Sequence, residues 1–218
     1  MSSISLISVV RNEQENIERM LRSILGVVDE IIIIDQQSED QTREVATKLL
    51  QRYRVPTIWE MSNHVGYAEL SRQRAIDLAS GDYVLLLDGD EMFNLSSLSG
   101  FNRDAYILSR KTVIHLNGAP CIEYSDYEQL RFCKRSLAFH HNDIHWTMSC
   151  NTTDKGLIRE AILEVKTVEE TLADYQRYEA HQSRDFQRWM IEVLSRCIKH
   201  GPPSNPVVAP FWGKPEDW

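Results

Sequence analysis

The first ninety residues alternate between short apolar runs and longer stretches with helical spacing. The apolar runs are rich in β-branched residues and have few polar positions, which is typical of strands buried on both faces. Between them, apolar residues recur every three or four positions, as on the buried face of a helix. The predicted strands lie at residues 4–10, 30–35, 56–61 and 83–88. This order predicts an α/β fold with an open, doubly wound, mostly parallel sheet and helices on both of its faces.

Local signals also predict where the intervening helices begin and end. Asn12 with Glu15 has the spacing of a capping box, and Ser38 with Gln41 has the same spacing. Both signals predict helices that begin directly after the first and second strands. Gly81 is predicted to end the third helix as a left-handed cap.

The second half of the chain has a weaker pattern. It predicts a mixed β region followed by a C-terminal helix, with strands at 105–116, 128–135 and 138–147 and the helix at 171–200. We interpret residues 1–200 as one domain with two halves, 1–95 and 96–200. Residues 201–218 form a proline-rich tail, since Gly201-Pro202-Pro203 would end the helix.

Composition and charge narrow the class of protein. The formal net charge is −8, from 24 Lys and Arg against 32 Asp and Glu, which argues against a sequence-independent grip on nucleic acid. The four cysteines have no C-x-x-C spacing, the N-terminus lacks a signal-peptide pattern, and no apolar run could span a bilayer. We therefore expect a soluble, cytoplasmic protein without a transmembrane segment, which could lie at the periphery of a membrane, and its oligomeric state stays open.

Polar residues follow each predicted strand of the first half. They are Arg11-Asn12-Glu13, Asp35, Ser62-Asn63-His64 and Asp88-Gly89-Asp90-Glu91. Ligands of doubly wound sheets bind beyond the carboxyl ends of the strands, so we expect a site at this edge. Asp88 and Asp90 could approach a divalent cation and leave it free to bind a diphosphate, while Gly89 would leave room for a bulky ligand. An acidic turn or a helix cap is the alternative interpretation of this tripeptide.

The sequence has no glycine-rich dinucleotide fingerprint and no Walker loop. Phosphates would then be held by a metal ion and by arginine. Arg72 is the favoured phosphate ligand, whereas Arg74 is interpreted as a partner in a surface salt bridge.

Together these motifs resemble the family 2 glycosyltransferases of the GT-A fold, over about the first ninety-five residues. Asp29–Asp35 is similar to the family's "DEIIVVD", and Ser38–Thr42 to its "S-x-D-x-T". Ser71–Asp82 follows its "ARNxALxxAxGD" register, and Asp88-Gly89-Asp90 stands where its metal-binding D-x-D belongs. The sequence departs from the family at Gln36-Gln37, which replaces small residues, and at Gln73, which replaces asparagine.

The resemblance implies an inverting hexosyltransferase of glycan biosynthesis that uses a nucleotide sugar, with uridine diphosphate (UDP) as the nucleotide and Mn²⁺ or Mg²⁺ as cofactor. It implies that residues 1–95 bind the nucleotide sugar and residues 96–200 the acceptor. It also implies that Glu13 and Asp35 contact the base and ribose. The implied nucleotide-sugar-binding residues are Val10, Arg11, Glu13, Asp35, Arg72, Asp88 and Gly89, and the implied metal ligands are Asp88, Asp90 and His145.

The second half resembles lipopolysaccharide-core glucosyltransferases. Residues 126–135 are similar to their "DxQLRLFRR", and a "V-H-E" that follows in those relatives corresponds here to Asp143-Ile144-His145-Trp146. The histidine is retained and the glutamate is not. On a strand, Asp143 would share a face with His145, which makes it the first candidate for the general base, with Asp126 in reserve. A solvated loop acid, and for His145 a buried histidine, are the alternatives.

Two other functions remain open at this point. A sugar-phosphate nucleotidyltransferase also uses an α/β sheet and a metal, although the absence of glycine in Val10-Arg11-Asn12-Glu13 counts against it. A non-catalytic nucleotide-sugar-binding module would explain the missing glutamate after His145. The donor sugar is not predicted, and the acceptor could be a glycan, lipid-linked or protein-linked.

Overall fold

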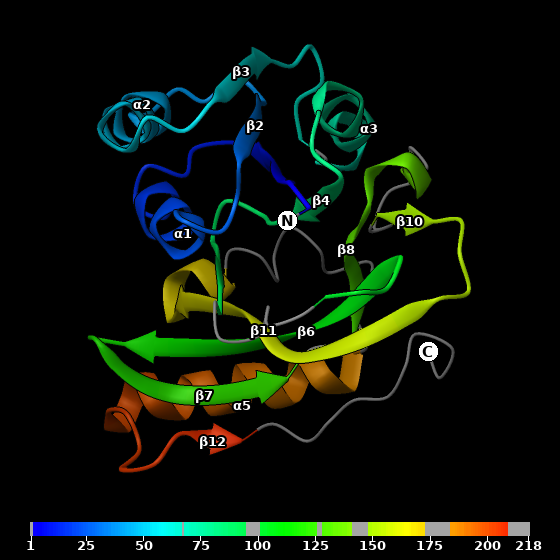
Figure 1. The fold of residues 1–218 in the computed structure, drawn as a ribbon. Helices are drawn as coiled ribbons and strands as arrows, with labels where there is room; N and C mark the ends of the chain where they lie inside the picture. The colour runs from blue at the N-terminus through cyan, green and yellow to red at the C-terminus, as the bar shows by residue number, and fades with distance from the viewer. Residues whose placement is uncertain are drawn as a thin grey trace. The chain divides into compact units, whose positions relative to one another are not determined.

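The computed structural model describes residues 2–66, 68–94, 101–125, 128–140, 148–172 and 184–208. The chain forms two compact units, and each unit combines segments that are separate in the sequence (Figure 1). The first unit comprises Met1–Ser109 and Glu128–Ile162, and the second comprises Arg110–Tyr127 and Leu163–Trp218.

The sheet of the first unit is built on four parallel strands. In spatial order these are β4 (Tyr83–Leu86), β1 (Ile4–Val10), β2 (Glu30–Asp35) and β3 (Thr57–Met61). β8 (Gln129–Lys134) extends the sheet beyond β4 as an antiparallel strand. Every residue of β1 is buried, which agrees with a strand that is covered on both faces.

Helices cover both faces of this sheet, as the sequence predicts. α1 (Ile17–Ile24) and α2 (Thr42–Tyr53) pack on one face, and α3 (Glu69–Leu78) packs on the other. The first face buries Met20 and Leu21 of α1 and Leu49 of α2 against Leu6, Ile31, Ile33 and Leu85. The second buries Ala75 and Ile76 of α3 against Ile7, Ile32, Ile34 and Leu86. The doubly wound arrangement is therefore confirmed.

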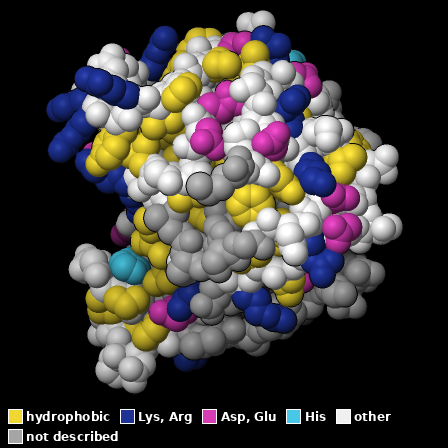
Figure 2. Space-filling model, viewed as in Figure 1, with side chains coloured by type: hydrophobic (Ala, Val, Ile, Leu, Met, Phe, Trp, Pro, Cys, Tyr) yellow, Lys and Arg dark blue, Asp and Glu magenta, His cyan; other side chains and the backbone are white. Residues whose placement is uncertain are grey.

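α2 shows how the amphipathic pattern separates core from surface. Ala46, Leu49 and Leu50 are buried, while Arg43 and Lys48 are exposed. Figure 2 shows Lys and Arg side chains gathered where α2 lies in Figure 1. The cationic side chains on the outer face of α2 stay hydrated while the opposite, apolar face is buried.

The predicted helix ends are wrong in detail. α1 begins at Ile17 and not directly after Asn12, because Asn12 takes a left-handed backbone conformation with φ of 56°. α2 begins at Thr42, and Ser38 belongs to the preceding loop. α3 ends at Leu78, and the residue that follows, Ala79, has an extended backbone, so no left-handed glycine ends this helix.

Gly81 has a different role from the predicted cap. A Cβ atom at this position would lie 2.6 Å from Ser5 Oγ and 2.9 Å from the Ser5 main-chain nitrogen. The Gly81 amide instead donates to Ser5 Oγ at 2.9 Å. Glycine is therefore required by the close approach of two backbone segments.

The rest of the first unit consists of short strands and the first part of β6 (Ala105–Leu116). Residues Ala105–Leu108 of β6 pair with β8, and β5 (Glu91–Phe93) pairs with β11 (Lys155–Thr167). The sequence interpretation did not include β5 or β11. Within the predicted strand 138–147, β9 covers Ala138–Phe139 and pairs with β10 (Ser149–Cys150), and 141–147 lie outside the described residues.

The second unit contains a hairpin and a helix. β7 (Ala119–Ser125) pairs antiparallel with the end of β6 through a tight turn at Asn117 and Gly118, whose φ values are 51° and 80°. β12 (Val207–Val208) runs parallel beside β7. α5 (Arg184–His200) lies within the predicted helix 171–200 and buries Met190, Val193, Leu194 and Cys197.

The described helices include none that is long and apolar enough to cross a membrane. All four cysteines are buried as free thiols.

Candidate functional site

The loops that follow β1 and β2 hold each other through main-chain amides and side-chain oxygens. The bonds run in both directions, since the amides of Glu39 and Gln41 donate to Asn12 Oδ1 at 2.8 Å and Gln14 Oε1 at 3.1 Å, and amides of the segment after β1 donate back. The latter bonds run from Asn12 N–H to Ser38 Oγ (3.0 Å), from Glu13 N–H to Thr42 Oγ1 (2.7 Å) and from Gln14 N–H to Asp40 Oδ2 (3.1 Å). The S-x-D-x-T pattern therefore fixes the backbone that carries Glu13.

Asp40 stays ionised in this arrangement. Burial alone would raise the pKa of its carboxyl group, but hydrogen bonds from Thr42 and from the Gln14 amide outweigh burial and lower the pKa. The carboxylate also accepts the main-chain amide of Thr42 at 3.0 Å, so it stabilises the first turn of α2.

Asp35 and Val10 lie side by side at the carboxyl ends of their strands. They are register partners in the parallel pairing of β1 with β2. Asp35 is buried, and its Oδ1 accepts the main-chain amide of Ser38 at 2.8 Å. The predicted nucleotide residues Val10 and Asp35 are thus adjacent, and Arg11 follows them on the exposed loop.

Glu13 lies directly over the turn that follows β4. A Cβ atom at Gly89 would come within 2.6 Å of Glu13 Cγ, so the absent side chain of Gly89 makes room for Glu13. Glu13 Oε2 accepts a hydrogen bond from Asn16 Nδ2 at 2.8 Å. The sequence interpretation assigned the space at Gly89 to a ligand, whereas the structure shows part of it filled by this glutamate.

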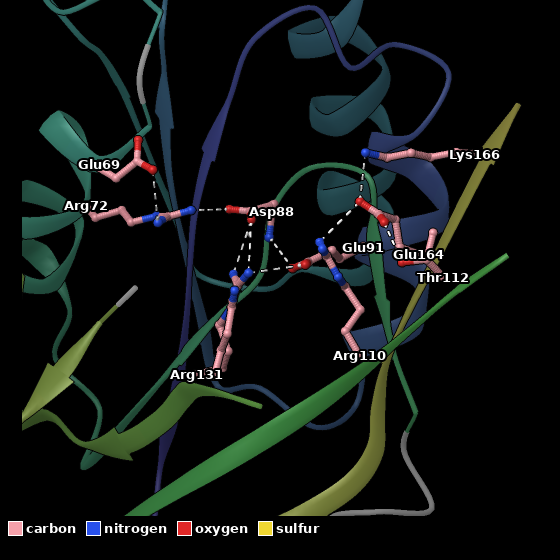
Figure 3. Close-up of polar contacts among 10 residues, drawn as sticks. Glu69, Arg72, Asp88, Glu91, Arg110, Thr112, Arg131, Glu164 and Lys166 are labelled. Atoms are coloured by element: carbon pink, nitrogen blue, oxygen red, sulfur yellow. Dashed lines mark hydrogen bonds and ion pairs between the residues drawn. The ribbon is translucent and has the colours of Figure 1, made fainter. Parts of the chain in front are cut away.

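Arg72 reaches the same turn from α3. The residue is buried, and its Nη2 donates to Asp88 Oδ1 at 2.8 Å (Figure 3). Glu69, one turn earlier on α3, lies 4.0 Å from Arg72 Nη1. By contrast, Arg74 is exposed and pairs with Glu60 at 2.8 Å, so the predicted surface salt bridge is confirmed.

Asp88–Glu91 forms a compact turn. The Glu91 amide donates to the Asp88 carbonyl at 3.1 Å, and the Asp88 amide donates to Glu91 Oε2 at 2.9 Å. Glu91 is fully buried, whereas Asp90 and Asp88 are partly exposed. Asp88-Gly89-Asp90 is therefore part of a turn, so the residues proposed to bind a ligand also have a structural role.

Arg131 of β8 completes this cluster, and the sequence interpretation did not include it. Its side chain is 4% exposed, and its Nη2 lies 3.2 Å from Asp88 Oδ2 and 3.3 Å from Glu91 Oε1. Figure 3 shows Arg72 and Arg131 converging on Asp88 from different elements. The available signal was the place of Arg131 between Leu130 and Phe132 in the predicted strand 128–135, because an arginine buried there needs an acidic partner.

A second polar cluster lies within the second unit. Glu164 is buried and accepts from Thr112 Oγ1 at 2.7 Å, from Lys166 at 3.1 Å and from Arg110 at 3.2 Å (Figure 3). Burial alone would raise the pKa of Glu164, but Arg110 and Lys166 outweigh burial and lower it to about 2. These three partners together compensate the buried negative charge of Glu164.

His140 and Gln73 form a further contact. His140 is buried, and its main-chain amide donates to Gln73 Oε1 at 2.7 Å. Gln73, at a departure from the family pattern, holds the chain at the end of β9.

The catalytic candidates of the second half fall elsewhere. Asp126, Asp143 and His145 lie outside the described residues. Among the residues that are described, no group of three or more His, Cys, Asp or Glu side chains could by itself hold a metal ion.

Comparisons with known proteins agree with the resemblance. Residues 5–101 match the family model described as glycosyl transferase family 2. Over 98 residues the chain is 37% identical to a TPR repeat-containing protein of Synechococcus elongatus, covering 42% of this chain and 21% of that protein. It is 32% identical over 91 residues to an uncharacterized glycosyltransferase of Rickettsia felis, covering 42% and 30%. The matched segment thus spans less than a third of the length of either relative.

Solved structures show the same fold. TarS 1–349 of S. aureus superposes with a TM-score of 0.55 at 15% identity, covering 91% of this chain and 72% of that chain. The same protein in complex with UDP gives a TM-score of 0.57 at 13% identity, covering 90% and 72%. The predicted fold class is therefore confirmed, and the family resemblance is confirmed for the segment that the family model matches.

Proposed function

We propose that this chain carries the donor site of a glycosyltransferase, which moves a hexose from a nucleoside-diphosphate sugar to a hydroxyl acceptor with inversion. The observation that carries the proposal is the convergence of Glu13, Arg72 and Asp88 at the carboxyl ends of parallel strands, within the segment that matches the family model. UDP is the proposed nucleotide, which the UDP complex of a protein with the same fold supports.

The loops after β1 and β2 would hold the base and ribose. Val10 and Asp35 lie next to each other there, and the hydrogen bonds to residues 38–42 hold Glu13 in place. A site held by hydrogen bonds before the ligand arrives loses less conformational entropy on binding. Arg11 follows on the same loop, and Arg72 would lie near the diphosphate.

A divalent ion fits the turn after β4 through Asp90. Asp90 is a partly exposed carboxylate two positions after Asp88 on this turn. Magnesium and similar ions are commonly held by one or two carboxylates together with substrate phosphates. When bound, Mn²⁺ or Mg²⁺ would neutralise the charge that develops on the departing diphosphate. His145 remains a proposed additional ligand.

The acceptor hydroxyl must lose a proton while it attacks the anomeric carbon. Asp143 is the proposed general base, with Asp126 in reserve, and a base of this kind typically contributes ~10²–10⁴-fold to the rate. Attack on the face opposite the diphosphate inverts the anomeric configuration. We further propose a cytoplasmic protein with a glycan, lipid-linked or protein-linked acceptor.

The test is release of nucleoside diphosphate from a panel of UDP-sugars with Mn²⁺, using wild type and Asp90→Ala. We expect wild type to release UDP and the variant to lose metal-dependent turnover with an unchanged melting temperature. Asp77→Asn, an exposed acid on α3, is the matched control and should keep full activity. Turnover retained by Asp90→Ala would contradict its role. Pyrophosphate as the product would indicate a nucleotidyltransferase, and tight binding without turnover a non-catalytic module.

A further inference from the structure

Arg131 lies outside the segment that matches the family model, yet it contacts the proposed donor site. It stands 43 positions after Asp88 in the sequence, on β8. β8 pairs with β4, the strand that leads into Asp88, and this pairing brings the guanidinium to the turn. The contact is therefore created by tertiary structure within the first unit.

The planar guanidinium of Arg131 donates hydrogen bonds to several acceptors at once. Nη1 and Nη2 both donate to Asp88 Oδ2 at 3.2 Å, Nη2 also lies 3.3 Å from Glu91 Oε1, and Nε donates to Gln129 Oε1 at 2.7 Å. A lysine ammonium is a point donor on a flexible stem and could not reproduce this planar geometry.

Arg72 and Arg131 hold different oxygens of Asp88. Arg72 binds Oδ1 and Arg131 binds Oδ2, so rotation of the carboxylate would break a charged hydrogen bond on either side. Glu91 adds a link to the backbone, because its other oxygen accepts the Asp88 amide at 2.9 Å. Fully buried Glu91 in turn needs a cation beside it, which Arg131 supplies.

We infer that Arg131 is a positioning residue of the donor site: it acts through Asp88 and Glu91 to hold the Asp88–Glu91 turn in the geometry that binds a nucleotide sugar. The inference rests on the proposed function, and it requires no contact between Arg131 and the donor.

Binding of UDP in the presence of Mn²⁺, measured by calorimetry, tests this role. We expect Arg131→Gln to weaken binding about 10- to 100-fold, the usual effect of removing a group that orients a ligand. Arg131→Lys should recover part of this loss because it keeps the charge. In an Asp88→Asn background, Arg131→Gln should weaken binding clearly less than it does in wild type, since part of its effect passes through Asp88. An undiminished effect in that background would overturn the inference.

A control variant separates positioning of the Asp88–Glu91 turn from the loss of an arginine contact elsewhere in the same unit. Arg135, just after β8, donates its Nε to the Gly81 carbonyl at 2.9 Å and does not belong to the Asp88 cluster. Arg135→Gln removes a partly buried arginine contact from the same unit, and it should leave the affinity for UDP within about twofold of wild type. Equal losses of affinity in Arg131→Gln and Arg135→Gln would show that Arg131 has only a structural role.

Hydrogen exchange tests the positioning without any nucleotide. The Asp88 amide should exchange faster in Arg131→Gln than in wild type or Arg135→Gln, because Glu91 loses its cation and releases the amide. Unchanged protection of Asp88 would refute the inference. If wild type binds no UDP while this exchange difference is present, the proposed function fails and the positioning role stands. If Arg131→Gln does not fold, Arg131→Lys takes its place in both measurements.

Discussion

Gly89→Ala is the most direct test of the link between Glu13 and the acidic turn. The new methyl group would lie 2.6 Å from Glu13 Cγ, 3.1 Å from its Cδ and 3.3 Å from its Cβ. A separation of 2.6 Å is far below van der Waals contact, so the Glu13 side chain must rotate away. The backbone of Gly89 is not in the left-handed region, so alanine adds no conformational strain there.

The change in stability that we expect for Gly89→Ala follows from two opposing effects. Replacing a glycine whose backbone suits alanine gains about 0.4–1 kcal/mol through the unfolded chain. Moving Glu13 breaks its hydrogen bond from Asn16, and a hydrogen bond to a charged group is worth about 1.5–3 kcal/mol. We therefore expect a net destabilisation of roughly 1–2 kcal/mol, or a few degrees in melting temperature for a chain of this size. If Glu13 contacts the nucleotide, its displacement should weaken binding at least about tenfold, which corresponds to ~1.4 kcal/mol.

The assay is a double-mutant cycle with Glu13→Ala, read out by melting temperature and by calorimetric binding of UDP with Mn²⁺. Glu13→Ala removes Cγ and Cδ, so Gly89→Ala should have almost no further effect in that background. If Gly89→Ala alone binds UDP as tightly as wild type, Glu13 is not a nucleotide contact. If the two effects add fully, alanine at position 89 acts by a route other than Glu13.

Two further predictions concern stability. Gly81→Ala should destabilise the fold by about 1–3 kcal/mol, because its Cβ would lie 2.9 Å from the Ser5 main-chain nitrogen and the backbone cannot rotate away. A melting temperature equal to that of wild type would contradict this close approach. Glu30 should stabilise the protein at neutral pH and lose this effect in acid. Burial alone would raise its pKa, but hydrogen bonds from Ser5, Ser80 and Gly81 outweigh burial and lower it below the ordinary 4.5. A lowered folded-state pKa stabilises above about pH 4.5, and the contribution disappears as the pH falls through the folded value. Thermal melts of wild type and Glu30→Gln between pH 3 and 7 should therefore converge in acid, and a gap independent of pH would argue against this role.

Some features of the site depend on sequence patterns that act over a few residues. The double-sided apolar strands predict a covered parallel sheet, and the acidic residues after β4 predict a polar turn at its edge. The exposure of Arg74 follows from its place on the outer face of α3, whereas its partner Glu60 lies 14 positions earlier, on β3. The Asn117-Gly118 dipeptide was an equally local signal for the hairpin of β6 and β7, although the sequence interpretation did not include it.

Other features depend on residues that are distant in the chain, and local patterns carry no information about them. Gly81 looks like a helix cap until β1 is placed beside it, and the space at Gly89 looks open until Glu13 is placed over it. Helix α1 begins later than its capping pattern predicts, since Asn12 bonds instead to the loop after β2.

The amino-acid sequence by itself determined the parallel sheet, the helices on its two faces and the acidic edge, because hydrophobic periodicity and strand ends are encoded within about ten residues. Only the tertiary structure decided which groups hold that edge in place. Arg131 reaches Asp88 across 43 positions, and the pairing of β8 with β4 alone brings these charges together. Breaking this contact is costly, because it would leave the guanidinium of Arg131 buried without its acceptors.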